Sequence, residues 1–402
     1  MNVDKIREDF PVLQKKINGK FIIYFDSSCV TLKPKQVIEA MNEYYESYPG
    51  CAGRSIHRFG SKVTDKVKES REKIAKFIGA KKPEEIIFTR NTTEGINLLA
   101  HSLDLKKNDI VLTTDREHNS NLIPWQMLVK TIGIKHKTVF SKKDMTFDTE
   151  NFKNIVKGAK IVSFVHCSNL DGYTTPAEEI IKIAHDNDAL VILDGAQSAP
   201  HKTVNVKKLD VDFFAFSGHK MLGPSGIGAL YGKQHLIEEL NPFIVGGDTV
   251  QNSTYDSCVF LKPPEKFEAG LQNYAGMVGF AEAASYIDNV GKENIQRHEI
   301  ELNKIITQGV EEIDGSSIIG PHSPELRGGI TSFNIKGIKY HDIAIMLDER
   351  ANIMIRSGQH CVHSWFNGHG IEGSARVSLY LYNTKEEAKV FIDNLKEISK
   401  LR

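Results

Sequence analysis

The sequence predicts an α/β fold in which a mostly parallel β-sheet carries helices on both faces and a smaller α+β domain follows it. Between residues 84 and 232, short apolar runs alternate with amphipathic stretches. These runs are rich in Val, Ile and Phe on both faces, which is typical of strands buried in a parallel sheet. After about residue 266 the pattern changes to long helical stretches and shorter strands, which favours a separate α+β unit.

The elements predicted for the sheet alternate along the chain as a parallel arrangement requires. The strands are "EEIIFTR" (84–90), "NDIVLTT" (108–114), "AKIVSFVHC" (159–167), "ALVILDGA" (189–196), "VDFFAFSGH" (211–219) and "GIGALYG" (226–232), and the helices are 92–103 and 177–188. A helical stretch near 276–313, strands at 328–335 and 375–382 and a closing helix at 384–401 follow. We therefore expect a large domain over 18–265 and a small one over 1–17 and 266–402, with an N-terminal helix at about 2–10 packed on the small domain.

Composition narrows the class of protein. The chain has 402 residues, of which 40% are hydrophobic and 25% charged, enough to bury a core in two domains. Lys plus Arg and Asp plus Glu both number 51, so no global basic field favours nucleic acid or an anionic membrane. The five cysteines are scattered without a CxxC pair, and the N-terminus lacks an apolar signal segment. These features favour a cytoplasmic protein without a disulfide framework.

Polar residues follow the predicted strands where ligands of such sheets bind. Asp194 ends one strand, and Ser217, His219 and Lys220 end the next. A lone Asp at such a place is most often a helix cap or half of an ion pair, and a lone Lys beside a Gly-rich loop is most often exposed. A buried lysine, however, has a lowered pKa and becomes a nucleophile toward carbonyls.

Two further segments add binding groups. Thr92 and Thr93 open a helix, where hydroxyls and backbone N–H groups bind anions, although an ordinary cap is the simpler interpretation. His118 stands in a polar turn, where it could cover a planar ligand, move protons or merely face solvent. Together, an amine, a carboxylate, an anion site and a flat ring suit pyridoxal phosphate, which needs all four.

The motifs "FDSSCVTLKP", "FTRNTTEGINL", "EHNSNLIPW", "LDGAQSAPH", "FSGHKMLGPSGIGALYG", "FEAGLQNYAG", "RSGQHC" and "ARVSLYLYNTKEE" occur in one order. In this order the chain resembles the class V aminotransferase family of fold-type I pyridoxal-phosphate enzymes. Within it, the chain is similar to the SufS-type (group II) cysteine desulfurases and selenocysteine lyases, over roughly residues 20–390. The resemblance implies a seven-stranded sheet and a homodimer whose active sites are completed across the interface.

The resemblance also implies roles for the cofactor-binding residues. Lys220 would bond the cofactor covalently and move protons at the substrate α-carbon. Asp194 would pair with the ring nitrogen, Gln197 would bond the ring hydroxyl, and His118 would stack on the ring and take part in proton transfer. The residues that would hold the phosphate are Thr92, Thr93, Ser217 and His219.

The remaining implied roles concern substrate and sulfur. Arg376 and Asn169 would grip the substrate carboxylate, and Arg356 would lie near the nucleophile. Cys361 would be the catalytic cysteine, accepting sulfur from L-cysteine as a persulfide while L-alanine leaves. The sulfur would pass to an acceptor of the SufE or SufU type or to a scaffold for iron–sulfur cluster assembly. L-selenocysteine is an alternative substrate that the sequence does not separate from L-cysteine.

Departures from the family pattern raise further expectations. Leu271 stands where the family commonly has a threonine that reaches the partner subunit's phosphate. Cys29 replaces a usual small residue and is expected to be a buried thiol, with the mouth of the active site as the alternative. Trp365 and Phe366 should alter the loop after Cys361 and its choice of acceptor.

Three other functions would use part of the same residues. A metalloprotein could use His360, Cys361, His363 and His369, but H-C-x-H is not a standard zinc spacing, so no metal is expected. Another pyridoxal-phosphate C–S lyase or an epimerase-like relative would keep the cofactor, although an epimerase does not need Cys361. A scaffold for cluster assembly would not need Lys220 and Asp194.

Overall fold

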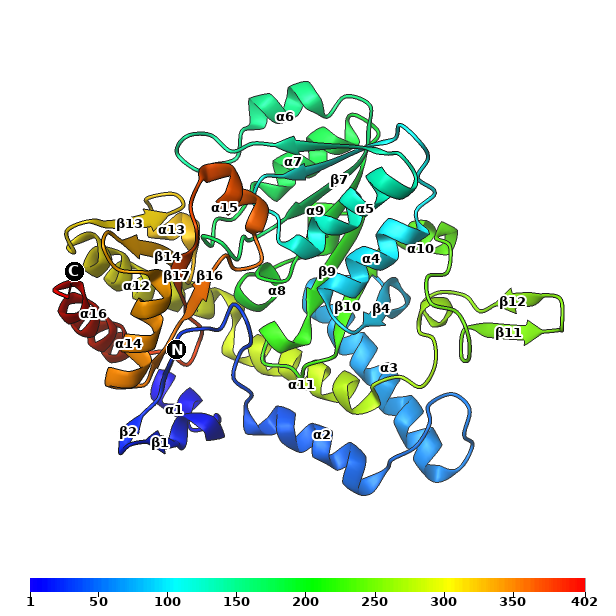
Figure 1. Cartoon of the computed structure of the whole chain (residues 1–402). Coiled ribbons are helices and arrows are strands. Elements are labelled where there is room, and N and C mark those ends of the chain that lie inside the picture. Colours follow the sequence, from blue (N-terminus) through cyan, green and yellow to red (C-terminus); the bar gives the residue numbers. More distant parts are fainter. Residues whose placement is uncertain (402) are drawn as a thin grey trace.

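The computed structural model describes residues 1–401 and contains the expected seven-stranded sheet (Figure 1). Its strand order is β4-β10-β9-β8-β7-β5-β6. The strands are β4 (Ile86–Thr89), β5 (Ile110–Thr114), β6 (Lys135–Val139), β7 (Ala159–Val165), β8 (Leu190–Asp194), β9 (Phe213–Ser217) and β10 (Gly228–Gly232). The α/β fold class predicted from the sequence is confirmed.

The sheet is parallel from β6 to β9 and antiparallel at its other edge. β5 pairs in parallel with β6 and β7, β7 with β8, and β8 with β9, whereas β10 is antiparallel to both β9 and β4. The carboxyl ends of β5, β7, β8 and β9 therefore meet at one edge. Ligands of such sheets bind at this edge, so the polar residues that follow these strands lie where a ligand would bind, as the sequence predicts.

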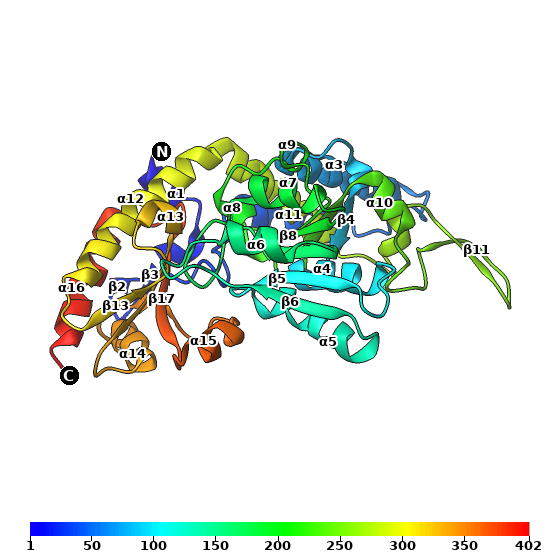
Figure 2. The same ribbon diagram turned by 90° about the horizontal axis from the view of Figure 1, so that it is seen from above.

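Helices cover both faces of the sheet (Figure 2). One face packs against α4 (Thr92–Ser102) and α5 (Ile123–Thr131), and the other against α3 (Arg58–Ile78), α7 (Ala177–His185) and α11 (Tyr274–Val290). Within β4, Ile87 packs on the face covered by α4 and α5, whereas Ile86 and Phe88 pack on the face covered by α3, α7 and α11. This alternation follows from the two-residue repeat of a strand, and it explains why the strands are apolar on both sides.

The smaller unit is an antiparallel sheet backed by helices. Its strands lie in the order β13 (Ser316–Ile319), β14 (Ile330–Ile335), β17 (Ser374–Ser378) and β16 (Arg356–Gly358). The helices α12 (Lys292–Glu311), α14 (Tyr340–Ala351) and α16 (Lys385–Ser399) bury a second apolar core against it. The long helical stretch expected near 276–313 is two helices, because Gly291, at φ 89°, ends α11 and begins α12.

The chain crosses between the two units more than once. The N-terminal helix α1 (Val3–Arg7) contacts the small unit through Arg7, which pairs with Glu387 at 2.7 Å. Strand β3 (Ile23–Tyr24) pairs in parallel with β15 (Ile353–Met354), and α11 packs against α3 and α2 (Lys35–Ser47). The division into 18–265 and 1–17 with 266–402 stays a proposal, since β3 and α11 each pack across it.

The other α-helices and strands complete the two units. They are β1 (Lys16–Ile17), β2 (Lys20–Phe21), α6 (Thr149–Ile155), α8 (Ser198–His201), α9 (Val206–Leu209), α10 (Gln234–Glu239), α13 (Pro324–Arg327), α15 (His363–His369) and the hairpin β11 (Val250–Ser253) with β12 (Cys258–Phe260). The hairpin projects from the body in both views (Figures 1 and 2). None of the helices within residues 1–401 combines the length and apolar character needed to cross a bilayer.

Candidate active site

One cavity gathers every residue to which the resemblance gives a catalytic, cofactor-binding or substrate-binding role. It has a volume of about 300 Å³ and lies at the carboxyl ends of β7, β8 and β9, against β16, β17 and the loop that precedes α15. Residues far apart in the chain thus reach one space. The predicted residues that line it are Thr92, Thr93, His118, Asn169, Asp194, Gln197, Ser217, His219, Lys220, Arg356, Cys361 and Arg376.

Asp194 and Lys220 are the acidic and the basic group that line this cavity side by side on neighbouring strands. Asp194 ends β8, and Lys220 follows the neighbouring parallel strand β9 by three residues. Burial raises the pKa of Asp194, while the N–H of Ala196 and the Lys220 charge oppose that rise. Burial lowers the pKa of Lys220, and Asp194 opposes that change. The site therefore favours a neutral amine, and it offers a carboxyl group that gains from a cationic partner.

His118 is held as a neutral ring. Its Nδ1 accepts from the backbone N–H of Ser120 at 3.1 Å, so the proton of the neutral imidazole lies on Nε2. Burial, followed by the Lys220 and Arg376 charges, lowers the pKa of His118 to about 3. A neutral, half-buried imidazole can cover a flat ligand without adding charge, and it can donate from Nε2.

Hydroxyl groups gather at the N-terminus of α4. Thr92 donates its backbone N–H to Ser217 Oγ at 2.8 Å, and the Thr92 and Ser217 hydroxyls lie 2.7 Å apart. The Thr93 hydroxyl lies 2.7 Å from that of Ser120. Burial, with the charges of Lys220 and Lys33, lowers the pKa of His219 to about 4. A helix N-terminus with several hydroxyls suits a phosphate group.

Arg376 is fixed on β17 but keeps donors free. Its Nη2 pairs with Asp26 Oδ1 at 3.1 Å, and its Nη1 donates to the Asn169 carbonyl at 3.0 Å. The guanidinium is only 3% exposed, and its Nε has no partner among the described residues. An arginine held in this way can offer a planar edge to a carboxylate, the geometry that gives strong bidentate bonds.

Several buried polar atoms of the cavity lack partners within the described chain. They include Ser28 Oγ, Gln197 Oε1 and His360 Nδ1, while Gln197 Nε2 donates to the Ser28 carbonyl at 2.7 Å. Buried groups of this kind are normally bonded, so they indicate a polar ligand. Gln197 Oε1 suits a hydroxyl donor, Asp194 a protonated ring nitrogen, and Lys220 an aldehyde. The residues present therefore fit pyridoxal phosphate.

Cys361 is presented on a loop with unusual backbone angles. His360 has φ 51° and Cys361 has φ 59°, both left-handed and neither glycine. Such residues cost about 1–3 kcal/mol each and persist where surrounding contacts impose them. Here Asn119 donates its N–H to the Cys361 carbonyl at 2.8 Å, and Asn169 Nδ2 donates to the His360 carbonyl at 2.7 Å. The backbone that carries the exposed thiol of Cys361 is therefore held by two hydrogen bonds.

The segment after Cys361 is an anchor. Val362, Trp365 and Phe366 are 0%, 4% and 0% exposed and form one apolar cluster with Leu170 and Ile319. Both Trp365 and Phe366 are buried, so any effect on the acceptor would come through the loop, and the expected effect on the choice of acceptor stays a prediction. They dock α15, and the loop before it, on the large unit.

The histidines of this region have other partners. His360 Nε2 lies 2.8 Å from Ser374 Oγ, His363 Nδ1 lies 2.9 Å from Asn119 Nδ2, and His369 stacks on Trp365 with ring centroids 4.0 Å apart. Within residues 1–401 no group of three His, Cys, Asp or Glu side chains could hold a metal ion. The four residues of the alternative metal site thus do not form one.

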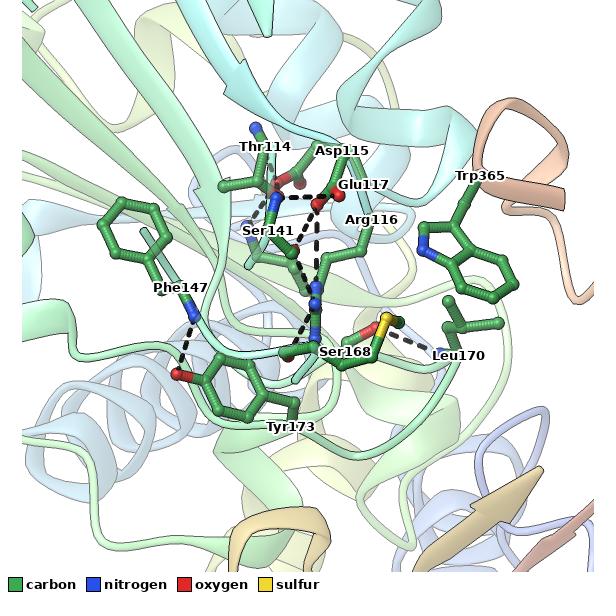
Figure 3. A network of polar contacts seen from close by, with 12 residues as sticks. Thr114, Asp115, Arg116, Glu117, Ser141, Phe147, Ser168, Leu170, Tyr173 and Trp365 are labelled. Carbon is green, nitrogen blue, oxygen red and sulfur yellow. Dashed lines mark hydrogen bonds and ion pairs between the residues drawn. The ribbon is translucent and has the colours of Figure 1, made fainter. Parts of the chain in front are cut away.

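A buried arginine organises the wall behind Asn169. Arg116 donates from Nη1 to Asp171 at 2.8 Å and from Nη2 to Ser141 Oγ at 2.6 Å and the Met145 carbonyl at 2.8 Å. The guanidinium also lies 4.9 Å from the centre of the Tyr173 ring. Figure 3 shows Arg116 between Ser141 and Tyr173, with Trp365 beside Leu170. The segment that carries Asn169 is therefore fixed by an ion pair on one side and apolar packing on the other.

Replacing Arg116 with methionine is expected to destabilise the protein by about 3–5 kcal/mol, because it leaves the buried Asp171 without its cation. Asp171 is 0% exposed, so water cannot take the place of the guanidinium. Urea unfolding of both proteins measures the difference. Lys153→Met, which breaks an exposed pair with Glu150, is the control and should change stability by less than about 0.5 kcal/mol. Equal effects of the two substitutions would contradict the prediction.

Sequence reasoning assigned no role to several residues that the structure places in the site. Asp26, the partner of Arg376, lies within the motif "FDSSCVTLKP", and Ser120, between His118 and Thr93, lies within "EHNSNLIPW". Cys29 lines the cavity and is half-buried. The expectation of a buried thiol is therefore wrong, and the alternative, a position at the active site, is confirmed. The other lining residues are Ser28, Asn91, Val165, Ala196 and His360.

A family model and a curated relative both match nearly the whole chain. The family model described as aminotransferase class-V matches residues 23–391. A protein of Synechocystis sp. named "Probable cysteine desulfurase" is 40% identical over 395 residues, which cover 97% of this chain and 94% of that protein.

Solved structures agree with this. The apo structure of the cysteine desulfurase from Thermococcus onnurineus NA1 matches with a TM-score of 0.95 and 40% identity, covering 99% of this chain and 98% of that one. The cysteine desulfurase CsdA from Escherichia coli, in an S-sulfonic acid form, matches with a TM-score of 0.92 and 29% identity, covering 100% of this chain and 99% of that one.

Proposed function

Because this chain belongs to the aminotransferase class-V family and is similar along its whole length to cysteine desulfurases, we propose that it converts L-cysteine to L-alanine and takes the sulfur onto Cys361 as a persulfide. One observation carries the proposal above the others. Cys361, Lys220 and Asp194, from three separate parts of the chain, line a single cavity.

Pyridoxal phosphate is the cofactor of this family, and the cavity supplies a residue for each of its groups. Lys220 would hold it covalently, Asp194 would bond its ring nitrogen, Gln197 its hydroxyl, and His118 would cover its ring. Thr92, Thr93, Ser217 and His219 would hold the phosphate. When bound, the cofactor withdraws electrons from the substrate α-carbon and so weakens the bond between the β-carbon and sulfur.

The protein's own groups orient the substrate and move its protons. Arg376 and Asn169 bind the carboxylate, which fixes the side-chain sulfur relative to the loop of Cys361. Lys220 is poised for proton transfer at the α-carbon, because burial lowers the pKa of its amine. Arg356 contributes a second positive charge at the cavity wall.

Cys361 completes the reaction as a thiolate. Its sulfur attacks the sulfur of L-cysteine, the bond between that sulfur and the β-carbon breaks, and the electron pair stays with the carbon. Protonation of this carbon gives L-alanine, and the persulfide remains on Cys361. An external thiol or an acceptor protein then removes the outer sulfur.

Purified protein loaded with pyridoxal phosphate tests the proposal. We expect L-cysteine and a reductant to yield sulfide and L-alanine in equal amounts, and mass spectrometry without reductant to find one added sulfur on Cys361. The absence of both products from the loaded enzyme would overturn the proposal. L-selenocysteine assayed in parallel measures the substrate preference between the two amino acids.

Arg376→Lys is expected to lower kcat/KM for L-cysteine by about 10- to 100-fold, mainly through KM, because lysine cannot offer the planar fork to a carboxylate. Steady-state kinetics over a range of L-cysteine concentrations measures this. Arg297→Lys, on the exposed face of α12, is the matched control and should leave both constants unchanged. An unchanged KM in Arg376→Lys would remove Arg376 from the substrate site.

We also propose a homodimer, supported by apolar side chains at one end of the molecule. Ile56 is 99% exposed, Tyr255 at the tip of the hairpin is 108% exposed, and Leu271 is 73% exposed. The segments that carry them are in contact, since Arg54 pairs with Asp248 and the Gly270 N–H donates to the Gly247 carbonyl at 2.8 Å, and exposed apolar side chains gathered in this way mark an interaction surface. Light scattering should give twice the monomer mass, and Tyr255→Asp should weaken the association. Leu271 has no hydroxyl, so no phosphate contact from its side chain is expected across the interface.

The acceptor of the sulfur is proposed to be a protein of iron–sulfur cluster assembly. This rests on the exposed thiol of Cys361, which an acceptor thiol can reach. Adding a candidate acceptor with its own cysteine should raise the rate of L-alanine formation without a reductant. No rise with any such acceptor would restrict the enzyme to small-molecule thiols.

A further inference from the structure

A second thiol shares the cavity with Cys361. Cys29 lies in the turn after β3, and its side chain is half-buried in the cavity wall, whereas Cys361 is exposed. The two come from opposite ends of the sequence, 332 residues apart, as their numbers show. In a cavity of about 300 Å³, groups that line the wall can reach the same bound molecule. None of the reaction steps proposed for Cys361, Lys220 and Arg376 involves Cys29.

The turn that carries Cys29 is firmly placed. The Cys29 N–H donates to the Asp26 carbonyl at 3.1 Å, and the Ser28 N–H donates to Ser378 Oγ at 3.0 Å. The Ser27 hydroxyl lies 2.7 Å from that of Tyr382. These contacts tie the turn to β17, which also bears Arg376, and to the segment that follows β17. The backbone that carries Cys29 is therefore held in place at the cavity wall.

The surroundings of Cys29 suit a sulfur anion. Arg356 Nη1 lies 3.8 Å from Cys29 Sγ and donates to it. Burial lowers the pKa of Lys220, and negative charge on Asp194, Cys29 or Cys361 opposes that change, so both sulfurs lie close enough to affect the same amine. Two arginines, Arg356 and Arg376, also line the cavity that the thiols share, so a persulfide there would have positive charge nearby.

We propose that Cys29 is a second sulfur acceptor, which takes the outer sulfur of the Cys361 persulfide. The Cys29 sulfur attacks the outer sulfur, a new S–S bond forms on Cys29, and the S–S bond of Cys361 breaks. The electron pair of the broken bond stays on the Cys361 sulfur, which takes the proton that Cys29 releases. One persulfide and one thiol become one persulfide and one thiol, so no oxidant or reductant is consumed.

This exchange rests on the proposed desulfurase activity and extends it. Cys361 is restored for a second turnover while the first sulfur is kept at a half-buried position. The enzyme then holds two sulfur atoms per subunit when no acceptor is present. The exposed persulfide serves an acceptor directly, and the inner one is protected from solvent.

The test loads the pyridoxal-phosphate enzyme with excess L-cysteine without reductant, alkylates it and maps the added sulfur by peptide mass spectrometry. We expect persulfide on the peptides of Cys361 and Cys29, and none on the Cys29 peptide of Cys361→Ser. Cys29→Ala should lower the sulfur bound per subunit by about half and retain the first, rapid formation of L-alanine. A bifunctional thiol reagent should link Cys29 to Cys361 in the wild type, which measures their proximity independently.

The exposed Cys258 of the hairpin is the control for indiscriminate sulfur transfer. It should gain sulfur more slowly than Cys29, and Cys258→Ser should not change the total by more than its own share. Persulfide on Cys361 alone, with Cys29 unmodified, would overturn this inference and leave the desulfurase intact. Absence of persulfide on Cys361 would instead overturn the proposed function. Equal labelling of Cys29 and Cys258 would also count against a specific exchange.

Discussion

Replacing Cys361 with serine is expected to lower the release of sulfide from L-cysteine by at least about 10³-fold, because a hydroxyl is not ionised near neutral pH and oxygen is a poor nucleophile toward sulfur. The structure leaves the rest of the machinery untouched, since the backbone carbonyl of Cys361, and not its side chain, accepts from Asn119. Sulfide and L-alanine measured over the same period in both proteins give the change.

Two controls accompany the Cys361→Ser measurement. The variant should keep the visible absorbance of bound pyridoxal phosphate, which shows that the cavity is intact. Cys258→Ser removes an exposed thiol from the hairpin and should retain wild-type activity. Sulfide formation by Cys361→Ser at the wild-type rate would assign the sulfur transfer to another group.

Replacing Lys220 with alanine should lower the formation of both sulfide and L-alanine by at least about 10³-fold, because it removes the covalent link to the cofactor and the base at the α-carbon together. The amine suits both roles, since burial lowers its pKa beside Asp194. The loaded variant should lose the absorbance of covalently attached cofactor and show that of the free aldehyde form. Kinetics and the spectrum together report the effect.

Lys208→Ala, on the exposed surface of the same unit, provides the comparison for Lys220→Ala and should behave as the wild type. Added alkylamines should partly restore activity to Lys220→Ala by entering the vacated space. Full activity in Lys220→Ala would contradict the assignment of the amine.

The sequence predicted the sheet well because its signals are local. Apolar runs such as 189–196 and 211–219 have the length and composition of buried strands, and β8 and β9 form there. The polar residue after each run then indicated the edge where the site lies. Asp194 and Lys220 could be placed on successive strands, and the structure brings them to one cavity.

Features that depend on tertiary contacts were not visible in the sequence. Strand β6 was missed, since Lys135–Val139 is an edge strand of four polar residues and one valine and lacks the apolar run of the inner strands. Trp365 gave no sign of its burial, because the apolar cluster forms only when α15 meets Leu170. Arg116 received no role from the sequence, because only the fold surrounds it with Asp171, Ser141 and Met145.

The way Cys361 is mounted has a consequence for delivery. Both peptide groups of His360 and Cys361 are tied to the large unit, and the helix that follows is sunk into an apolar cluster. The persulfide sulfur is thus carried on a rigidly held loop and not on a mobile one. An acceptor protein therefore has to bring its own thiol to the rim of the cavity on a narrow, extended segment. The movement needed for sulfur transfer is made by the acceptor and not by the loop of Cys361.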